Sequence, residues 1–283
     1  MTLIVAHKDC MDGLCGAAII SDLLSSKPHE VIFAAYGDDT YNIINHSASH
    51  IIFVDFSFNR EDTLLCAAKF DSVTILDHHK TAEANLSGIT DEASNIELIF
   101  DMNKSGAMLA YDYAKPRDFP KQVVEYIQDR DLWTWKLLNS KEFNEGLRHL
   151  VKPNDIVNFN SIIYAHEDEL EPIISVGTTL LQSTDKYVNS KLQNTQIINL
   201  NGQAFVVCNT TTAMSELGNA LCKEHNLPSA TYQISSTGQV WWSLRSLDTL
   251  PDISSVAKVY GGGGHRNAAG FEINIELLPL FLE

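Results

Sequence analysis

The stretch Val73-Thr74-Ile75-Leu76-Asp77-His78-His79-Lys80 changes character abruptly, because an apolar run ends in an acid and two histidines. The apolar run predicts a buried strand. In an open parallel sheet, ligands bind just beyond the carboxyl ends of the strands. Carboxylate and imidazole at such an end form a ligand set suited to Mn²⁺, Zn²⁺ or Fe²⁺. Alone, the stretch would also fit a polar turn in which Asp77 caps a helix.

Two other apolar runs end in the same kinds of side chain. Residues 3–6 lead into His7 and, after a short turn, Asp12, whereas residues 51–54 lead into Asp55. The predicted segments alternate between strands (3–6, 31–35, 51–54 and 73–76) and helices (14–24 and 60–70). This alternation predicts a parallel α/β sheet, in which the polar strand ends converge. Carboxylates brought together cost energy unless cations neutralise them, so the pattern predicts a metal centre.

Beyond residue 80 the chain is predicted to be mainly helical. Ser105 is expected to cap a helix of small residues. Residues 123–135 are expected to form a helix that contains Asp129-Arg130-Asp131-Leu132-Trp133. Apolar periodicity over 173–192 predicts a helix that leads to a second domain. The expected domains are an N-terminal domain over 1–165, a helical linker over 166–195 and a C-terminal domain over 196–283.

The C-terminal part ends in a glycine-rich segment. Residues 204–208 predict a strand, and 230–234 with 240–246 predict a hairpin. Gly261-Gly262-Gly263-Gly264 then precedes His265-Arg266-Asn267. We expect a loop here whose backbone N–H groups can face an anion, as in phosphate-binding nests.

Charge and cysteine content limit the class of protein. The formal net charge is -16, and no cluster of lysines and arginines is present. A protein that follows many phosphates along a duplex usually has a basic face, so a long nucleic acid is not expected as the main partner. A small anionic ligand held by metal ions stays compatible.

Five cysteines occur without a Cys-x-x-Cys pair, which is typical of a protein in the reducing cytoplasm. The N-terminal apolar stretch is too short for a signal peptide. No apolar run reaches the roughly 20 residues that span a bilayer, so no membrane association is expected.

Two distant motifs resemble those of the DHH phosphoesterase superfamily. The first is Asp77-His78-His79, and the second is Ser243-Leu244-Arg245-Ser246 together with the glycine-rich segment that ends in His265. The resemblance covers nearly the whole chain. It implies an N-terminal DHH domain with a parallel sheet and helices on both faces, linked by a helix to a smaller mixed α/β DHH-associated domain. Members of the family are Mn²⁺-dependent phosphohydrolases, including short-oligonucleotide ribonucleases, dinucleotide phosphodiesterases and RecJ-type exonucleases.

The resemblance also implies site residues. The implied metal ligands are His7, Cys10, Asp12, Asp55, His78 and Asp129, with Asp131 as the alternative to Asp129. Asp55 would bridge two ions. Asp55 and Asp77 are implied catalytic residues together with His79, which would lie near the scissile phosphate. Substrate contacts are implied for Arg245, Ser246, Gly263, Gly264, His265 and Arg266.

Cys10 departs from the family pattern, and other candidate positions have alternative roles. Cys10 stands where the family usually has an aspartate, so it either ligates as a thiolate or leaves the first metal site weaker. Asp9 is a weaker candidate, because it also fits a solvated turn. Asp77, or one of the two histidines that follow it, could instead orient the other ligands.

The implied function is hydrolysis of short oligonucleotides or linear dinucleotides to mononucleotides by a two-metal mechanism. Two Mn²⁺ ions are expected, with Mg²⁺, Co²⁺ or Zn²⁺ as alternatives, and a homodimer is compatible with the pattern. One alternative is a phosphatase of small bisphosphorylated nucleotides of the 3′-phosphoadenosine 5′-phosphate type. The other is a nucleotide-binding sensor with a degraded metal site, which the cysteine at position 10 favours.

Overall fold

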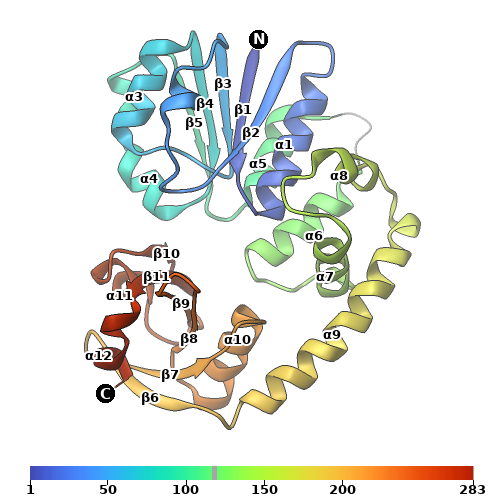
Figure 1. The fold of residues 1–283 in the computed structure, drawn as a ribbon. Helices are drawn as coiled ribbons and strands as arrows, with labels where there is room; N and C mark the ends of the chain where they lie inside the picture. The colour runs from blue at the N-terminus through green and yellow to red at the C-terminus, as the bar shows by residue number, and fades with distance from the viewer. Residues whose placement is uncertain (117–119, 283) are drawn as a thin grey trace. The chain divides into compact units, whose positions relative to one another are not determined.

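The computed structural model describes residues 1–116 and 120–282. The chain divides into two compact units, Met1–Leu181 and Gln182–Glu283 (Figure 1). The helix predicted to lead to a second domain is α9 (Glu171–Lys191), and the division between the units falls within it.

The N-terminal unit contains the predicted parallel sheet. Its strands lie in the order β2-β1-β3-β4-β5, and all neighbours are parallel. The strands are β1 (Thr2–His7), β2 (His29–Ala34), β3 (His50–Val54), β4 (Ser72–Asp77) and β5 (Ile96–Phe100). The chain leaves β1 toward β2 on one side, and β3 returns to the other side of β1. The carboxyl ends of β1 and β3 therefore meet at the switch point where open α/β sheets bind ligands.

Helices cover both faces of this sheet, as predicted (Figure 1). In β1, Ile4 and Ala6 belong to the core beneath α1 (Met11–Leu23) and α5 (Gly106–Ala114), whereas Leu3 and Val5 belong to the opposite core. Alternate residues of a strand point to opposite faces, so a fully apolar strand can serve two cores. The opposite core is covered by α3 (Arg60–Lys69) and α4 (Lys80–Leu86).

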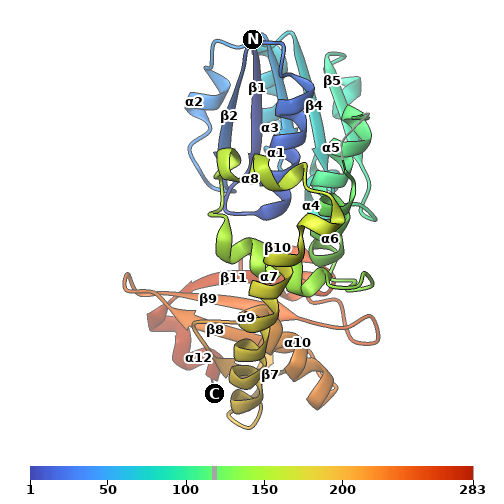
Figure 2. The same ribbon diagram turned by 90° about the vertical axis from the view of Figure 1, so that its right-hand side faces the viewer.

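The remaining helices of this unit follow the last strand. They are α6 (Gln122–Asp131), α7 (Ser140–Leu150), α8 (Ile156–Ile163) and the start of α9, and shorter segments are α2 (Tyr41–Ile44), η1 (Ile89–Asp91) and η2 (Glu167–Glu169). Figure 2 shows α8 in front of α1. The prediction that one helix runs from 123 to 135 is wrong, because α6 ends at Asp131. Trp133 and Trp135 have left-handed backbones, with φ of 55° and 51°, which no helix continues through.

The C-terminal unit is the predicted smaller mixed α/β domain. Its sheet has the order β10-β11-β9-β8-β7-β6, in which only β7 and β8 pair in parallel. The strands are β6 (Gln196–Leu200), β7 (Gln203–Asn209), β8 (Ser229–Ile234), β9 (Gln239–Arg245), β10 (Gly263–His265) and β11 (Ala268–Asn274), and the helices are α10 (Met214–His225), α11 (Ser254–Val259), η3 (Ile275–Leu277) and α12 (Leu278–Leu282).

The glycine-rich segment differs from the predicted loop. Gly263 and Gly264 lie in β10, which pairs with β11 as a tight antiparallel hairpin. The glycines themselves do not predict a strand, because the segment forms one only by pairing with residues that follow the turn. In the part of the chain that the structure describes, no helix is both long and apolar enough to cross a membrane.

Candidate metal centre

Asp55 lies at the centre of the polar strand ends. It follows β3 in a left-handed backbone conformation, with φ of 55°, and its N–H donates to the carbonyl of Leu76 at 2.9 Å. A non-glycine residue held in this region costs about 1–3 kcal/mol, and such residues cluster at functional sites. The conformation places its Oδ1 3.1 Å from His78 Nε2 and its Oδ2 3.5 Å from His7 Nδ1.

One oxygen of Asp55 has no hydrogen-bond partner within the described chain. The residue is 1% exposed, and Oδ2 is buried without such a partner. The 3.5 Å to His7 is long for a hydrogen bond. Buried polar atoms are nearly always satisfied, so an unsatisfied carboxylate oxygen surrounded by other donor atoms is suited to a cation.

The potential ligands form three overlapping groups, each with donor atoms within 4.8 Å of one another. The groups are His7–Cys10–Asp55, Asp55–His78–His79 and Asp12–His78–Asp131. Asp55 and His78 each belong to two groups. Shared donors of this kind fit two adjacent divalent cations, and imidazole with carboxylate suits the first-row metals.

Asp12 is fixed by the helix that follows β5. Its carboxylate accepts hydrogen bonds from the backbone N–H of Gly106 at 2.5 Å and of Ala107 at 3.0 Å. The side chain of Ser105 accepts from Met108 N at 3.3 Å, which confirms the predicted N-cap. The N-terminus of α5 therefore orients Asp12 through groups that would otherwise lack partners.

A side chain at position 106 would have no room. A Cβ there would lie 2.4 Å from Asp55 Cβ and 3.0 Å from Asp12 Oδ2. Glycine thus lets the first turn of α5 touch both carboxylates of the centre.

Several acidic side chains lie close together in the centre, and they shift the pKa values of their neighbours. Burial, together with the charges of Asp55 and Asp131, raises the pKa of Asp12 well above its usual value. Burial and the same carboxylates also raise the pKa of the Cys10 thiol. Burial alone would lower the pKa of His78, but its hydrogen bond to Asp55 and the nearby acids raise it instead. The neighbouring carboxylates thus oppose one another's negative charge, and a bound cation would relieve this repulsion.

Asp77 organises the turn after β4. It is fully buried, and its Oδ1 accepts from His78 N at 2.7 Å, from His79 N at 3.2 Å and from His79 Nδ1 at 2.7 Å. Its Oδ2 accepts from Ser57 Oγ at 2.8 Å. Asp77 is in none of the three donor groups. Its contacts orient His79, so it fits the positioning alternative considered from the sequence.

The two acids of the Asp129-Arg130-Asp131 segment have separate positions. Asp131 Oδ2 lies 3.5 Å from His78 Nε2, with its side chain 24% exposed. Asp129, which the sequence favoured as the ligand, instead accepts from Lys136 N at 2.8 Å, Leu137 N at 3.2 Å and the Thr134 hydroxyl. It therefore shapes the loop after α6, and only Asp131 joins a donor group.

The other predicted residues have their own partners. Asp9 pairs with Asn154 through two hydrogen bonds of 2.9 and 3.0 Å, outside the donor groups. In the C-terminal unit, Ala268 lies opposite both Arg245 and His265, so these two side chains lie in one row on one face of the sheet. Arg266 instead donates to the carbonyls at 248 and 250, and the buried Ser246 hydroxyl donates to that of residue 251.

Sequence reasoning missed Tyr36, Ser57 and Gly106. Tyr36 follows β2, and its ring lies 5.6 Å from that of His7 and 6.0 Å from that of His79. The signal for Tyr36 is its position just beyond the carboxyl end of β2, next to the strand ends that carry the proposed ligands.

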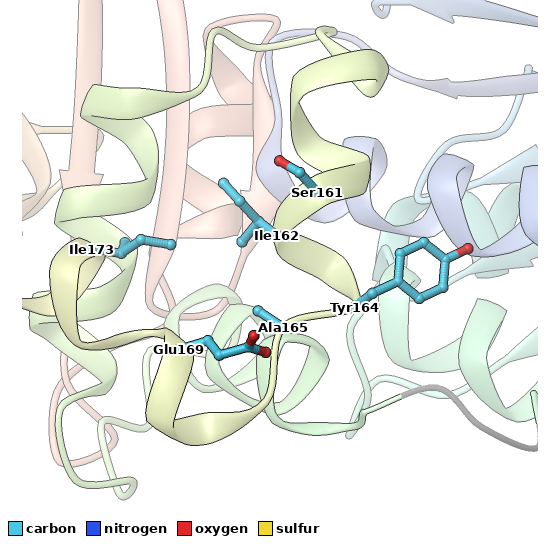
Figure 3. Close-up of a pocket in the computed structure, with 6 residues that line it drawn as sticks. All are labelled: Ser161, Ile162, Tyr164, Ala165, Glu169 and Ile173. Carbon is cyan, nitrogen blue, oxygen red and sulfur yellow. The ribbon is translucent and has the colours of Figure 1, made fainter.

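A separate pocket of about 280 Å³ lies between α8 and the start of α9 (Figure 3). It is lined by Ser161, Ile162, Tyr164, Ala165, Glu169 and Ile173. None of these residues belongs to the donor groups. The pocket is therefore not part of the candidate metal centre.

No family model matches the chain. An uncharacterized protein of Acanthamoeba polyphaga mimivirus is 29% identical over 230 residues, which cover 78% of this chain and 52% of that protein. The chain thus spans about half the length of that relative. The oligoribonuclease NrnB of Bacillus subtilis is 24% identical, over 98% of this chain and 74% of that protein.

Solved structures share the fold. A DHH domain has a TM-score of 0.65 at 12% identity, covering 99% of this chain and 84% of that one. The exonuclease RecJ bound to manganese has a TM-score of 0.58 at 14% identity, covering 99% and 88%. The pGpG-specific phosphodiesterase PggH of Vibrio cholerae has a TM-score of 0.51 at 16% identity, covering 99% and 94%. At these identities the likeness establishes the architecture.

Replacing Gly106 with alanine is expected to disrupt the centre. The added Cβ would displace Asp55 or Asp12, so Mn²⁺ affinity measured by calorimetry should fall at least tenfold, and overpacking should destabilise the fold by about 1–3 kcal/mol. Asp112→Asn, on the same helix with its side chain 45% exposed, should change neither quantity much. Unchanged Mn²⁺ affinity in a folded Gly106→Ala protein would contradict this account.

Replacing the two acids of α6 separately should give different results. Asp131→Asn should weaken Mn²⁺ binding at a nearly unchanged melting temperature, because Asp131 only joins the donors. Asp129→Asn should lower stability by about 1.5–3 kcal/mol, because it weakens charged hydrogen bonds to the loop. For both variants, calorimetry measures Mn²⁺ affinity and thermal unfolding measures stability. The opposite pattern would make Asp129 the ligand.

Proposed function

Because the chain belongs to the DHH phosphoesterase superfamily, we propose that it is a metal-dependent phosphodiesterase that hydrolyses short oligonucleotides or linear dinucleotides to mononucleotides. The observation that carries the proposal is the position of Asp55. Its carboxylate is shared between two donor groups, and one of its oxygens is buried without a hydrogen-bond partner among the residues that the structure describes. A bridging carboxylate between two cations is what hydrolysis at paired metal ions needs.

The ligand assignment follows the donor groups. His7 and Cys10 would hold one ion, Asp12, His78 and Asp131 would hold the other, and Asp55 would bridge them. We propose that Asp131, and not Asp129, is the metal ligand that α6 supplies. When bound, the two ions would supply Lewis-acid activation of a water molecule and neutralise charge on the reacting phosphate. Manganese is the proposed ion, in keeping with the manganese-bound exonuclease of the same fold.

His79 is the proposed group for binding the scissile phosphate. Asp77 accepts from His79 Nδ1, and this contact fixes the orientation of the ring. Burial alone would lower the pKa of His79, but the hydrogen bond and charge of Asp77 raise it. A protonated His79 can donate to a phosphate oxygen and favours its negative charge.

The substrate class is proposed from the relatives and from charge. One relative is named an oligoribonuclease, and one structural neighbour is named a pGpG-specific phosphodiesterase. With a net charge of -16, the chain would attract a long polyanion only weakly, so binding would depend on local groups. Arg245, Ser246, Gly263, Gly264, His265 and Arg266 remain predicted substrate contacts on the basis of the family resemblance.

The test is a panel of dinucleotides, short RNA, short DNA, long duplex and bisphosphorylated adenosine, each assayed with Mn²⁺. We expect fastest release of mononucleotides from dinucleotides and short strands, and no turnover by Asp55→Asn even with excess Mn²⁺. Preference for bisphosphorylated adenosine would indicate a phosphatase. Nucleotide binding without any turnover would indicate a sensor. Wild-type rates in a folded Asp55→Asn protein would refute the role of Asp55.

Cys10→Asp is expected to tighten Mn²⁺ binding. Thiolate prefers softer ions than Mn²⁺, and carboxylate oxygen is the better donor for it. Calorimetry should show a higher Mn²⁺ affinity and a smaller preference for Zn²⁺ over Mn²⁺ than in the wild type. Cys15→Ser is the matched control, because Cys15 is buried and belongs to no donor group. Equal changes in both variants would mean that Cys10 is not a ligand.

A further inference from the structure

Tyr36 stands beside the metal centre without belonging to it. Strand β2 pairs with β1 so that Ala34 lies opposite His7, and Lys8 N donates to the Ala34 carbonyl at 2.9 Å. Tyr36 lies two residues beyond this pair. The topology therefore places an aromatic side chain at the carboxyl ends of the strands, where the proposed ligands also lie.

The ring of Tyr36 contacts two histidines of the centre. Its centroid lies 5.6 Å from that of His7 and 6.0 Å from that of His79, and both pairs are edge-to-face. It also lies 4.9 Å from the ring of Phe56, which is 1% exposed. The ring is thus supported from the protein side by a buried aromatic residue.

The turn that carries Tyr36 is fixed by its own hydrogen bonds. Ala35 N donates to Asp38 Oδ2 at 2.9 Å, and Asp38 N donates to the Ala35 carbonyl at 3.1 Å. Gly37 has a φ of +93°, which suits only glycine. Such a turn holds the ring in place before a ligand arrives, so binding would cost little ordering entropy.

Despite these contacts, Tyr36 is 55% exposed. An aromatic ring that is packed on one side and accessible on the other can stack a nucleobase, whatever the base, because every base has a π-face. The acidic centre beside it would hold phosphate through cations and through His79, whereas a base is flat and uncharged. The two parts of a nucleotide would therefore find separate partners here.

We propose that Tyr36 is the stacking residue for the nucleobase next to the scissile phosphate. The proposal rests on the proposed function for its substrate, a short oligonucleotide. It assigns to the N-terminal unit a base-binding residue that acts independently of sequence, beside groups that bind phosphate.

Binding of simple probes tests the proposal without any turnover. With Mn²⁺ present, the wild type should bind adenosine 5′-monophosphate more tightly than ribose 5-phosphate by about 5-fold to 150-fold, the range that stacking of one base supplies. Tyr36→Leu should lose this difference and Tyr36→Phe should keep it. Tyr41→Leu is the matched control, because Tyr41 is 67% exposed in the neighbouring α2.

Kinetics separate stacking from support of the histidines. Tyr36→Leu should raise KM for a dinucleotide with little change in kcat. It should not change KM for the same compound in which the base proposed to stack on Tyr36 is replaced by hydrogen. Equal losses on both compounds, or a loss confined to kcat, would show that Tyr36 only packs against His7 and His79. Equal binding of the two probes by the wild type would also overturn the proposal. Preferential binding of the base-containing probe in a protein that hydrolyses no dinucleotide would refute the proposed function and leave the stacking role standing.

Discussion

The carboxylate of Asp12 accepts hydrogen bonds from the first turn of α5, and this contact joins segments that are 94 residues apart. It brings the helix after β1 against the helix after β5, on one face of the sheet. The same turn passes so close to Asp55 that only glycine fits at position 106. Much of the geometry of the centre therefore depends on backbone atoms, which a rigid helix holds more precisely than a flexible side chain could.

The centre keeps several acids buried together in a chain that is already strongly acidic. Local contacts offset part of this cost. Helix α5 stabilises Asp12, and His79 with Ser57 stabilises Asp77. Asp55 keeps one buried oxygen without a hydrogen-bond partner in the described chain, and its backbone is in a costly conformation. Unfavourable features thus gather on the residue that is proposed to bridge the ions, as is common where a site is built for a ligand.

The sequence predicted the parallel sheet and the convergence of His7, Asp55 and His78, because strand ends follow directly from apolar runs. It could not separate Asp129 from Asp131. Residues two apart on a helix lie about 200° apart around its axis, and only the surrounding fold decides which of them faces the centre. The helix predicted over 123–135 was also longer than the observed α6. The left-handed backbones of Trp133 and Trp135 end it, and they depend on the contacts of Asp129 with the loop. The hairpin formed by the glycine-rich segment depends on a pairing that local composition does not reveal.

The proposed ligands come from four separate segments between His7 and Asp131. An unfolded chain would hold these donors far apart, so a cation would bind almost only to the folded N-terminal unit. Any species that binds the native state alone shifts the folding equilibrium, by about 2.7 kcal/mol when its free concentration is a hundred times Kd. The supply of metal ion would then act on the lifetime of the protein as well as on its chemistry. A cell short of the ion would hold fewer folded copies, because the apo form would be exposed more often to unfolding and degradation.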